Sequence, residues 1–179
     1  MKKTERQLEN AKKAKEAADR EFPGEKWILI EDGIFLSPRR PIGKRSSFQN
    51  ELRDAQIFRD FEGTVYLSPE ARKDPKKKYD AIVNGMLIEF KNMSGASTMT
   101  LKDHFLDSRE QAPNVFINLE YSPLSQKKIY NTLYRARNSD DYLVKSKNHK
   151  GGLVVLKING HDRLVYLNID DLEIKKPGA

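Results

Sequence analysis

The dipeptide Asn84-Gly85 divides a mostly apolar, β-rich stretch into two runs, residues 79–84 and 86–91. Both residues of a two-residue hairpin turn require a positive φ, which asparagine and glycine adopt more readily than other residues. This pattern constrains the fold more than any other in the chain, because it predicts two strands and also their antiparallel pairing. We therefore expect a β-hairpin at 79–91.

Two further turn dipeptides, Asp32-Gly33 and Asn159-Gly160, separate apolar runs and predict strand pairs at 26–38 and 152–169. Elsewhere, apolar side chains recur at helical spacing. This order of elements predicts an α/β or α+β fold, with a mixed sheet and flanking helices. The expected helices are residues 1–20, 48–63, 99–112 and 124–138, the last with Ile129, Leu133 and Tyr134 inward, and the other expected strands are 64–68 and 114–120.

The length of 179 residues suits one domain with a sizeable core. We expect residues 1–25 to form a helical extension or linker, and residues 26–179 to form a single domain with its core at about 47–120. No apolar run reaches the ~18 residues of a membrane span, and the N-terminus lacks the apolar region of a signal peptide. Because cysteine is absent, disulfides, thiolate metal sites and cysteine nucleophiles are excluded.

Lysine and arginine (33) outnumber aspartate and glutamate (26), so the net charge is +7 and the pI about 9.4. The basic residues cluster at 39–45, 72–78, 135–137 and 145–150. Such an excess favours polyanionic partners, nucleic acid first and an acidic membrane surface second. A soluble basic protein of another kind has the same composition, so charge alone leaves the partner open.

Three charged residues interrupt the apolar hairpin. Glu89 and Lys91 project from the same side of one strand, with Cα atoms about 7 Å apart. Asp80 is expected on the partner strand, at the end far from the turn, within reach of Glu89 or Lys91. A surface ion pair between Glu89 and Lys91 explains two of the three charges, but it leaves Asp80 without a reason to be there.

Two carboxylates and an ammonium group at one place suit phosphodiester chemistry. Mg²⁺ takes oxygen ligands and is commonly held by one or two carboxylates and a substrate phosphate. The bound ion polarises the phosphoryl group and acidifies a water molecule. A lysine beside it can orient that water or stabilise the charge that develops on phosphorus.

The order of elements and these residues resemble the PD-(D/E)XK nuclease superfamily, with its restriction-endonuclease-like fold. In this resemblance Asp80 corresponds to the aspartate of the second core strand, and Glu89 and Lys91 to the Glu-x-Lys of the third. Many members add a glutamate from the first core helix, for which Glu51 is the best match and Glu70 the alternative. The resemblance implies that Asp80, Glu89 and Glu51 bind Mg²⁺ or Mn²⁺ and that Lys91 acts on the nucleophile or the transition state.

Within the superfamily, residues 47–120 look most like the C-terminal tRNA-cleaving domains of bacterial contact-dependent growth inhibition toxins. This likeness implies an endonuclease that cleaves RNA, with tRNA the favoured substrate, and a cognate immunity protein as a possible partner. It also implies action in the cytoplasm, with delivery as part of a larger toxin. Two alternatives stay open: a DNA endonuclease of a phage or mobile element, and a nucleic-acid-binding module without catalysis.

Further side chains are candidates for a supporting role. The basic loops should hold the nucleic-acid backbone by charge, independently of sequence. His104 on the 99–112 helix is more simply explained by packing or exposure, and Gln111 is a weaker active-site candidate at the end of the same helix. The residues predicted to bind the backbone are Arg39, Arg40, Lys76, Lys77 and Lys78.

Overall fold

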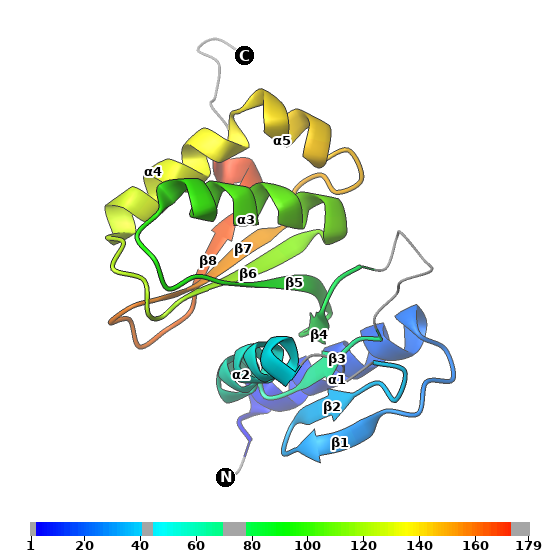
Figure 1. Cartoon of the computed structure of the whole chain (residues 1–179). Helices are drawn as coiled ribbons and strands as arrows, with labels where there is room; N and C mark the ends of the chain where they lie inside the picture. Colours follow the sequence, from blue (N-terminus) through cyan, green and yellow to red (C-terminus); the bar gives the residue numbers. More distant parts are fainter. Residues whose placement is uncertain (1–2, 41–44, 70–77, 173–179) are drawn as a thin grey trace. The chain divides into compact units, whose positions relative to one another are not determined.

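The computed structural model describes residues 3–40, 45–69 and 78–172 (Figure 1). The chain divides into two compact units, Met1–Phe90 and Lys91–Ala179, and the boundary lies inside strand β5 (Met86–Asn92). Each unit combines helices with parallel and antiparallel strands, so the predicted α+β class with a mixed sheet and flanking helices is confirmed. In the described part of the chain, no helix is both long and apolar enough to span a membrane.

The strands of the first unit run in the order β1-β2-β3-β4-β5. Strands β2 and β3 are parallel, whereas the β1–β2, β3–β4 and β4–β5 pairs are antiparallel. The predicted turn between β4 and β5 is present, with φ of 49° at Asn84 and 77° at Gly85. The four strands before β5 are β1 (Ile28–Glu31), β2 (Ile34–Leu36), β3 (Val65–Leu67) and β4 (Ala81–Val83).

Helices α1 (Glu5–Glu21) and α2 (Arg45–Glu62) contact β3, β4 and each other. Helix α1 was predicted as an exposed extension, but it buries a stripe of small residues, Ala14, Ala17 and Ala18. Small side chains let the helix approach the strands closely, and the sequence pattern of large apolar residues does not detect such a stripe. The N-terminal helix is therefore part of the first unit.

The second unit contains β6 (Asn114–Leu119), β7 (Leu153–Ile158) and β8 (Val165–Asn168), of which β6 and β7 are parallel and β7 and β8 antiparallel. Figure 1 shows its helices on one side of these strands. Alternate residues of β6 and β7 enter one apolar core with the inward faces of the helices. The helices are α3 (Thr98–Gln111), α4 (Gln126–Arg137), α5 (Asp140–Lys145) and the 3₁₀ helix η1 (Ile169–Leu172).

Two details of the second unit differ from the sequence-based expectation. Helix α5 was not predicted, because its six residues are too few to show a clear period. Tyr134 was predicted to face inward but is 42% exposed. The buried stripe of α4 consists of Ile129, Leu133 and Ala136. Tyr134 directly follows Leu133, so it points about 100° away from Leu133 around the helix axis.

Candidate active site

The hairpin β4–β5 brings two acidic residues to the same end of the strand pair. Its register pairs Ala81 with Ile88 and ends there, and Asp80 directly precedes Ala81 as Glu89 directly follows Ile88. The Asp80 N–H donates to the Ile88 carbonyl at 3.0 Å and not to Glu89, so the regular ladder does not continue to these two residues. Glu89 is buried, with 5% of its surface exposed.

Each oxygen of the Asp80 carboxylate has a partner. Oδ2 accepts a hydrogen bond from the Phe90 backbone N–H at 2.9 Å, which fixes the side chain against β5. Oδ1 lies 3.3 Å from Nη2 of Arg40. The side chain retains 21% of its exposure, so the carboxylate is held in place but still reaches solvent.

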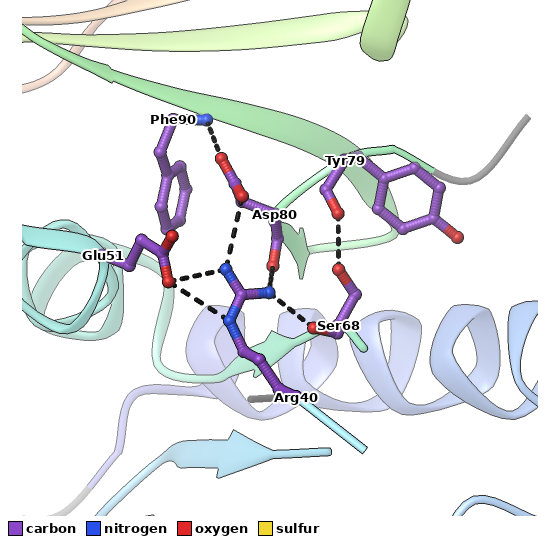
Figure 2. Close-up of polar contacts among 6 residues, drawn as sticks. All are labelled: Arg40, Glu51, Ser68, Tyr79, Asp80 and Phe90. Atoms are coloured by element: carbon purple, nitrogen blue, oxygen red, sulfur yellow. Dashed lines mark hydrogen bonds and ion pairs between the residues drawn. The ribbon is translucent and has the colours of Figure 1, made fainter. Parts of the chain in front are cut away.

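The second carboxylate comes from helix α2. Oε2 of Glu51 lies 2.6 Å from Nη2 of Arg40 and 3.2 Å from its Nε. The same guanidinium nitrogen therefore contacts Glu51 and Asp80, as Figure 2 shows. Two acidic residues 29 positions apart in sequence, on a helix and at the end of a strand, converge on one cation.

Arg40 is nearly completely enclosed, with 3% of its side chain exposed. Its Nη1 donates to the backbone carbonyls of Ser68 at 2.5 Å and Asp80 at 3.2 Å. Together with the carboxylate contacts, these account for the five N–H donors of a guanidinium. Burial lowers the pKa of Arg40, but the charges of Glu51 and Asp80 outweigh it, so the pKa is raised and the group stays charged.

A tight turn after β2 directs Arg40 inward. The Ser37 N–H donates to the Leu67 carbonyl on β3, and the Arg40 N–H donates back to the Ser37 carbonyl. The Ser37 hydroxyl accepts from the Arg39 N–H at 3.1 Å. The turn sends the two neighbouring arginines in opposite directions, so that Arg39 is exposed and paired with Glu25.

Ser68 closes the other side of the cluster. Its N–H donates to the Asp80 carbonyl at 3.0 Å, and its hydroxyl donates to the Tyr79 carbonyl at 2.5 Å (Figure 2). These bonds continue the β3–β4 pairing beyond the last ladder residues. The backbone around Asp80 is therefore held by three neighbours, Ser68, Ile88 and Arg40, before any side-chain contact is counted.

The carboxylates suit a divalent cation in their chemistry, since Mg²⁺ and Mn²⁺ prefer oxygen ligands. Glu51 and Asp80 already converge on one cation position, and Arg40 fills it. Over the described residues, no group of three or more histidine or acidic side chains is arranged to hold a metal ion. An ion would thus bind Glu51 and Asp80 only in exchange for the guanidinium.

Lys91 follows Glu89 by two residues on β5, and both side chains therefore project to the same side of that strand. Within the second unit, Lys91 affects His104 of α3. Burial lowers the pKa of His104, and the positive charge of Lys91 lowers it further. His104 is half-buried and is favoured in its neutral form. Sequence reasoning favoured packing or exposure for this histidine over a place in the active site.

The predicted backbone-binding residues have different surroundings. Arg40 is buried and engaged with carboxylates, which is not the position of a surface phosphate ligand. Arg39 is exposed but paired with Glu25, and Lys78 is exposed. Lys76 and Lys77, like the alternative acid Glu70, lie outside the described residues. Gln111 donates to the Asp107 carbonyl, at 3.4 Å.

Sequence reasoning missed the counter-ion function of Arg40. Its only sequence signal is indirect: two acids that converge in a partly buried place need a cation, and basic residues occur in a turn directly after a buried strand. Which of the arginines in 39–45 turns inward depends on hydrogen bonds to β3, which no local pattern predicts.

Residues 77–161 match the family model of the contact-dependent growth inhibition CdiA C-terminal domain. This central part of the chain is similar to that domain, and it contains Asp80, Glu89 and Lys91 but not Arg40 or Glu51. No curated protein matches the chain. A similar solved structure is the CdiA-CT/CdiI toxin and immunity complex from Burkholderia pseudomallei, with 19% identity and a TM-score of 0.47, covering 75% of this chain and 98% of that chain.

Proposed function

We propose that the protein is a toxin-type nuclease of the PD-(D/E)XK kind, which hydrolyses phosphodiester bonds in RNA, with tRNA as the favoured substrate. The observation that carries the proposal is the convergence of the Glu51 and Asp80 carboxylates on one cation, at the end of the hairpin whose strand β5 also carries Glu89. The match of residues 77–161 to the CdiA C-terminal domain supports the toxin class.

In this proposal Asp80, Glu89 and Glu51 would hold Mg²⁺ or Mn²⁺ once the Arg40 guanidinium has left its position between Glu51 and Asp80. The ion, when bound, would polarise the scissile phosphate and acidify a water molecule. Asp80 is held for this task by the Phe90 N–H and by the backbone bonds of Ser68 and Ile88. Lys91 orients the attacking water or stabilises negative charge on the phosphate, since its ammonium group is a compact point charge.

The first test compares single substitutions at the carboxylates and the lysine. Asp80→Ala, Glu89→Ala and Lys91→Ala should each abolish cleavage, and the double variant of both acids should lose little more than one alone, because groups that act as a unit lose activity non-additively. Circular dichroism and melting curves serve as the folding control. Full activity of folded Asp80→Ala would exclude this site.

The second test decides the substrate. Purified protein and Mg²⁺ are incubated with total tRNA, ribosomal RNA, and single- and double-stranded DNA at equal phosphate concentration. We expect discrete tRNA fragments first, no cleavage in EDTA, and recovery with Mg²⁺ or Mn²⁺. Rapid plasmid cleavage with intact tRNA would identify a DNA endonuclease. Binding of all four nucleic acids without cleavage of any would identify a binding module.

The toxin assignment predicts a delivered domain that acts in the cytoplasm of a target cell and is neutralised by a cognate immunity protein. Expression inside a bacterium should stop growth, whereas expression of Asp80→Ala should not. A small protein encoded next to this chain should restore growth when it is co-expressed and should co-purify with the chain. Growth arrest by Asp80→Ala at the same expression level would disconnect toxicity from the proposed site.

A further inference from the structure

Helix α4 carries basic and aromatic side chains on its outward face. Its buried stripe consists of Ile129, Leu133 and Ala136. At about 100° per residue, one continuous stripe on the other side of the helix, about 120° wide, contains only exposed residues. The outward face, as we define it, is Lys127, Lys128, Asn131, Tyr134 and Arg135.

The charge of this helix is entirely of one sign. Its sequence, QKKIYNTLYRAR, has four basic residues and no acidic one. Within the described part of the chain, no carboxylate forms an ion pair with Lys127, Lys128 or Arg135. The positive charge on the outward face of α4 is therefore not neutralised by any carboxylate among the described residues.

Helix α1 shows that this is not the general condition of an exposed helix here. It has as many acidic as basic residues, and its exposed lysines form pairs one turn apart along the helix. Nζ of Lys13 lies 2.7 Å from Glu9, and Nζ of Lys15 lies 2.6 Å from Asp19. Solubility is thus achieved on α1 with balanced charge, so solubility alone does not explain the outward face of α4.

Two of the lysines lie where a helix disfavours them. Ser125 is the N-cap of α4, which puts Lys127 and Lys128 in the first turn. Positive charge at this end opposes the helix dipole and is therefore unfavourable in the free protein. An anionic ligand at the outward face would remove that cost, and phosphate groups would also be close to the positive end of the dipole.

Tyr134 lies on the same outward face as these cations, with 42% of its surface exposed. An exposed aromatic ring among lysine and arginine side chains is typical of surfaces that bind single-stranded nucleic acid, where rings stack on bases and cations contact phosphates. An acidic protein would use the same charges but has no bases to stack. The ring therefore favours a nucleic acid over an acidic protein as the partner.

We propose that the outward face of α4 binds a single-stranded stretch of the RNA substrate. Lys127, Lys128 and Arg135 contact its phosphates, and Tyr134 stacks on a base. This assignment rests on the proposed function for the identity of the RNA as substrate. Binding itself does not require the carboxylates Asp80 and Glu89, so the two proposals can fail separately.

The test measures the binding of a fluorescein-labelled, unstructured 20-nucleotide RNA by anisotropy, using the full chain in EDTA, over a series of salt concentrations. The variant Lys127→Ala/Lys128→Ala should bind about tenfold more weakly, and its salt slope should fall by about 1.4, or about 0.7 for each phosphate of a single strand that is no longer neutralised. Tyr134→Ala should bind on the order of tenfold more weakly without a change in slope, whereas Tyr134→Phe should bind like the wild type.

The matched control is Lys12→Ala/Lys13→Ala, which removes two exposed lysines from the balanced helix α1. It should leave the RNA affinity unchanged. An equal loss in this control would mean that only net charge matters, which overturns the proposal. A polyglutamate probe tests the rival partner: if the α4 lysine pair is needed for polyglutamate but Tyr134→Ala leaves RNA binding intact, the face binds acidic protein and the RNA assignment is wrong.

A separate measurement distinguishes this proposal from the proposed nuclease. Asp80→Ala should keep the RNA affinity of the wild type in EDTA while losing cleavage in Mg²⁺. If neither the wild type nor any variant cleaves RNA but the α4 variants still bind it more weakly, the RNA-binding proposal for α4 holds and the nuclease assignment fails. If the α4 variants bind and cleave RNA like the wild type, the face is not part of the substrate site.

Discussion

Each unit of the protein has a buried arginine, and the two arginines have opposite environments. Arg40 of the first unit is 5% exposed and Arg109 of the second is fully buried. Arg40 contacts two carboxylates and two backbone carbonyls. Arg109 donates to the carbonyls of Pro113, His149 and Gly151 at 2.6–2.7 Å, without a carboxylate among these partners.

The pKa values follow the difference in partners. Burial lowers the pKa of Arg109, and no carboxylate compensates it fully, whereas Glu51 and Asp80 raise the pKa of Arg40 in spite of burial. Aromatic contact adds to the support of Arg109, whose guanidinium lies 5.9 Å from the centre of the Tyr142 ring. Arg109 thus ties the chain before β7 to the end of α3.

A structural arginine and an arginine in a functional site differ in the groups that hold them. Backbone carbonyls bind a guanidinium through directed hydrogen bonds. They carry no net charge, so they do not favour a metal ion over the guanidinium. Two carboxylates that share one guanidinium nitrogen form a negatively charged position that other cations can also occupy. We therefore expect divalent ions to bind at the Arg40 site and not at the Arg109 site.

The largest effect should come from Arg109→Ala. Three buried carbonyls would lose their donor, and an unsatisfied buried acceptor costs about 1–3 kcal/mol, so the free energy of unfolding should fall by about 3–5 kcal/mol. Urea denaturation measures it, with Arg137→Ala, which removes a partly exposed arginine near the same Tyr142 ring, as the control. A loss below about 1 kcal/mol would show that the bonds of Arg109 to these carbonyls do not stabilise the second unit.

Arg40→Met should destabilise by less, about 2 kcal/mol. It leaves Glu51 and Asp80 facing each other without a counter-ion, a situation that costs about 3–5 kcal/mol at fully buried sites, but both side chains are about one-fifth exposed and solvent screens them. Adding Glu51→Gln should restore part of the stability. If the double variant is no more stable than Arg40→Met, the repulsion between the two carboxylates is not the cause.

The metal response should separate the two arginines directly. Arg40→Met should bind Mn²⁺ on the order of tenfold more tightly than the wild type, because the guanidinium no longer competes for the carboxylates. A thermal shift on addition of Mn²⁺ reports this binding without any nuclease assay. Arg109→Met is the control and should respond like the wild type. Weaker Mn²⁺ binding by Arg40→Met would mean that Arg40 positions the carboxylates for the ion and does not compete with it.

The smallest effect concerns pH, and only the second unit. Burial and Lys91 lower the pKa of His104, and burial and Arg109 lower that of His149. Both groups are therefore neutral when folded at pH values where the unfolded chain, with histidine pKa near 6.5, takes up protons. The contribution of the two histidines to the free energy of unfolding should be fully present above about pH 6.5. It should be lost as the pH falls through their lowered pKa values in the folded protein. His149→Gln should flatten this decline in pH-dependent melting curves, and an unchanged profile would contradict the assignment.

The elements of the fold could largely be predicted from the sequence. The Asn84-Gly85 turn has the positive φ values that its residues favour, and the helices and strands follow the apolar periods with shifts of a few residues. These features are local, because a turn or an amphipathic helix is specified by residues that are at most a few positions apart.

The register of the hairpin was also determined by the sequence, since its two-residue turn pairs Val83 with Met86 and Ala81 with Ile88. The tertiary structure alone decided that Arg40 is the cation between Glu51 and Asp80, that the small residues of α1 are buried, and that Tyr134 faces solvent. Each of these depends on partners that are distant in the chain, and the free energy of burying a charge depends on whether such partners arrive. Residue type and local pattern carry no information about that.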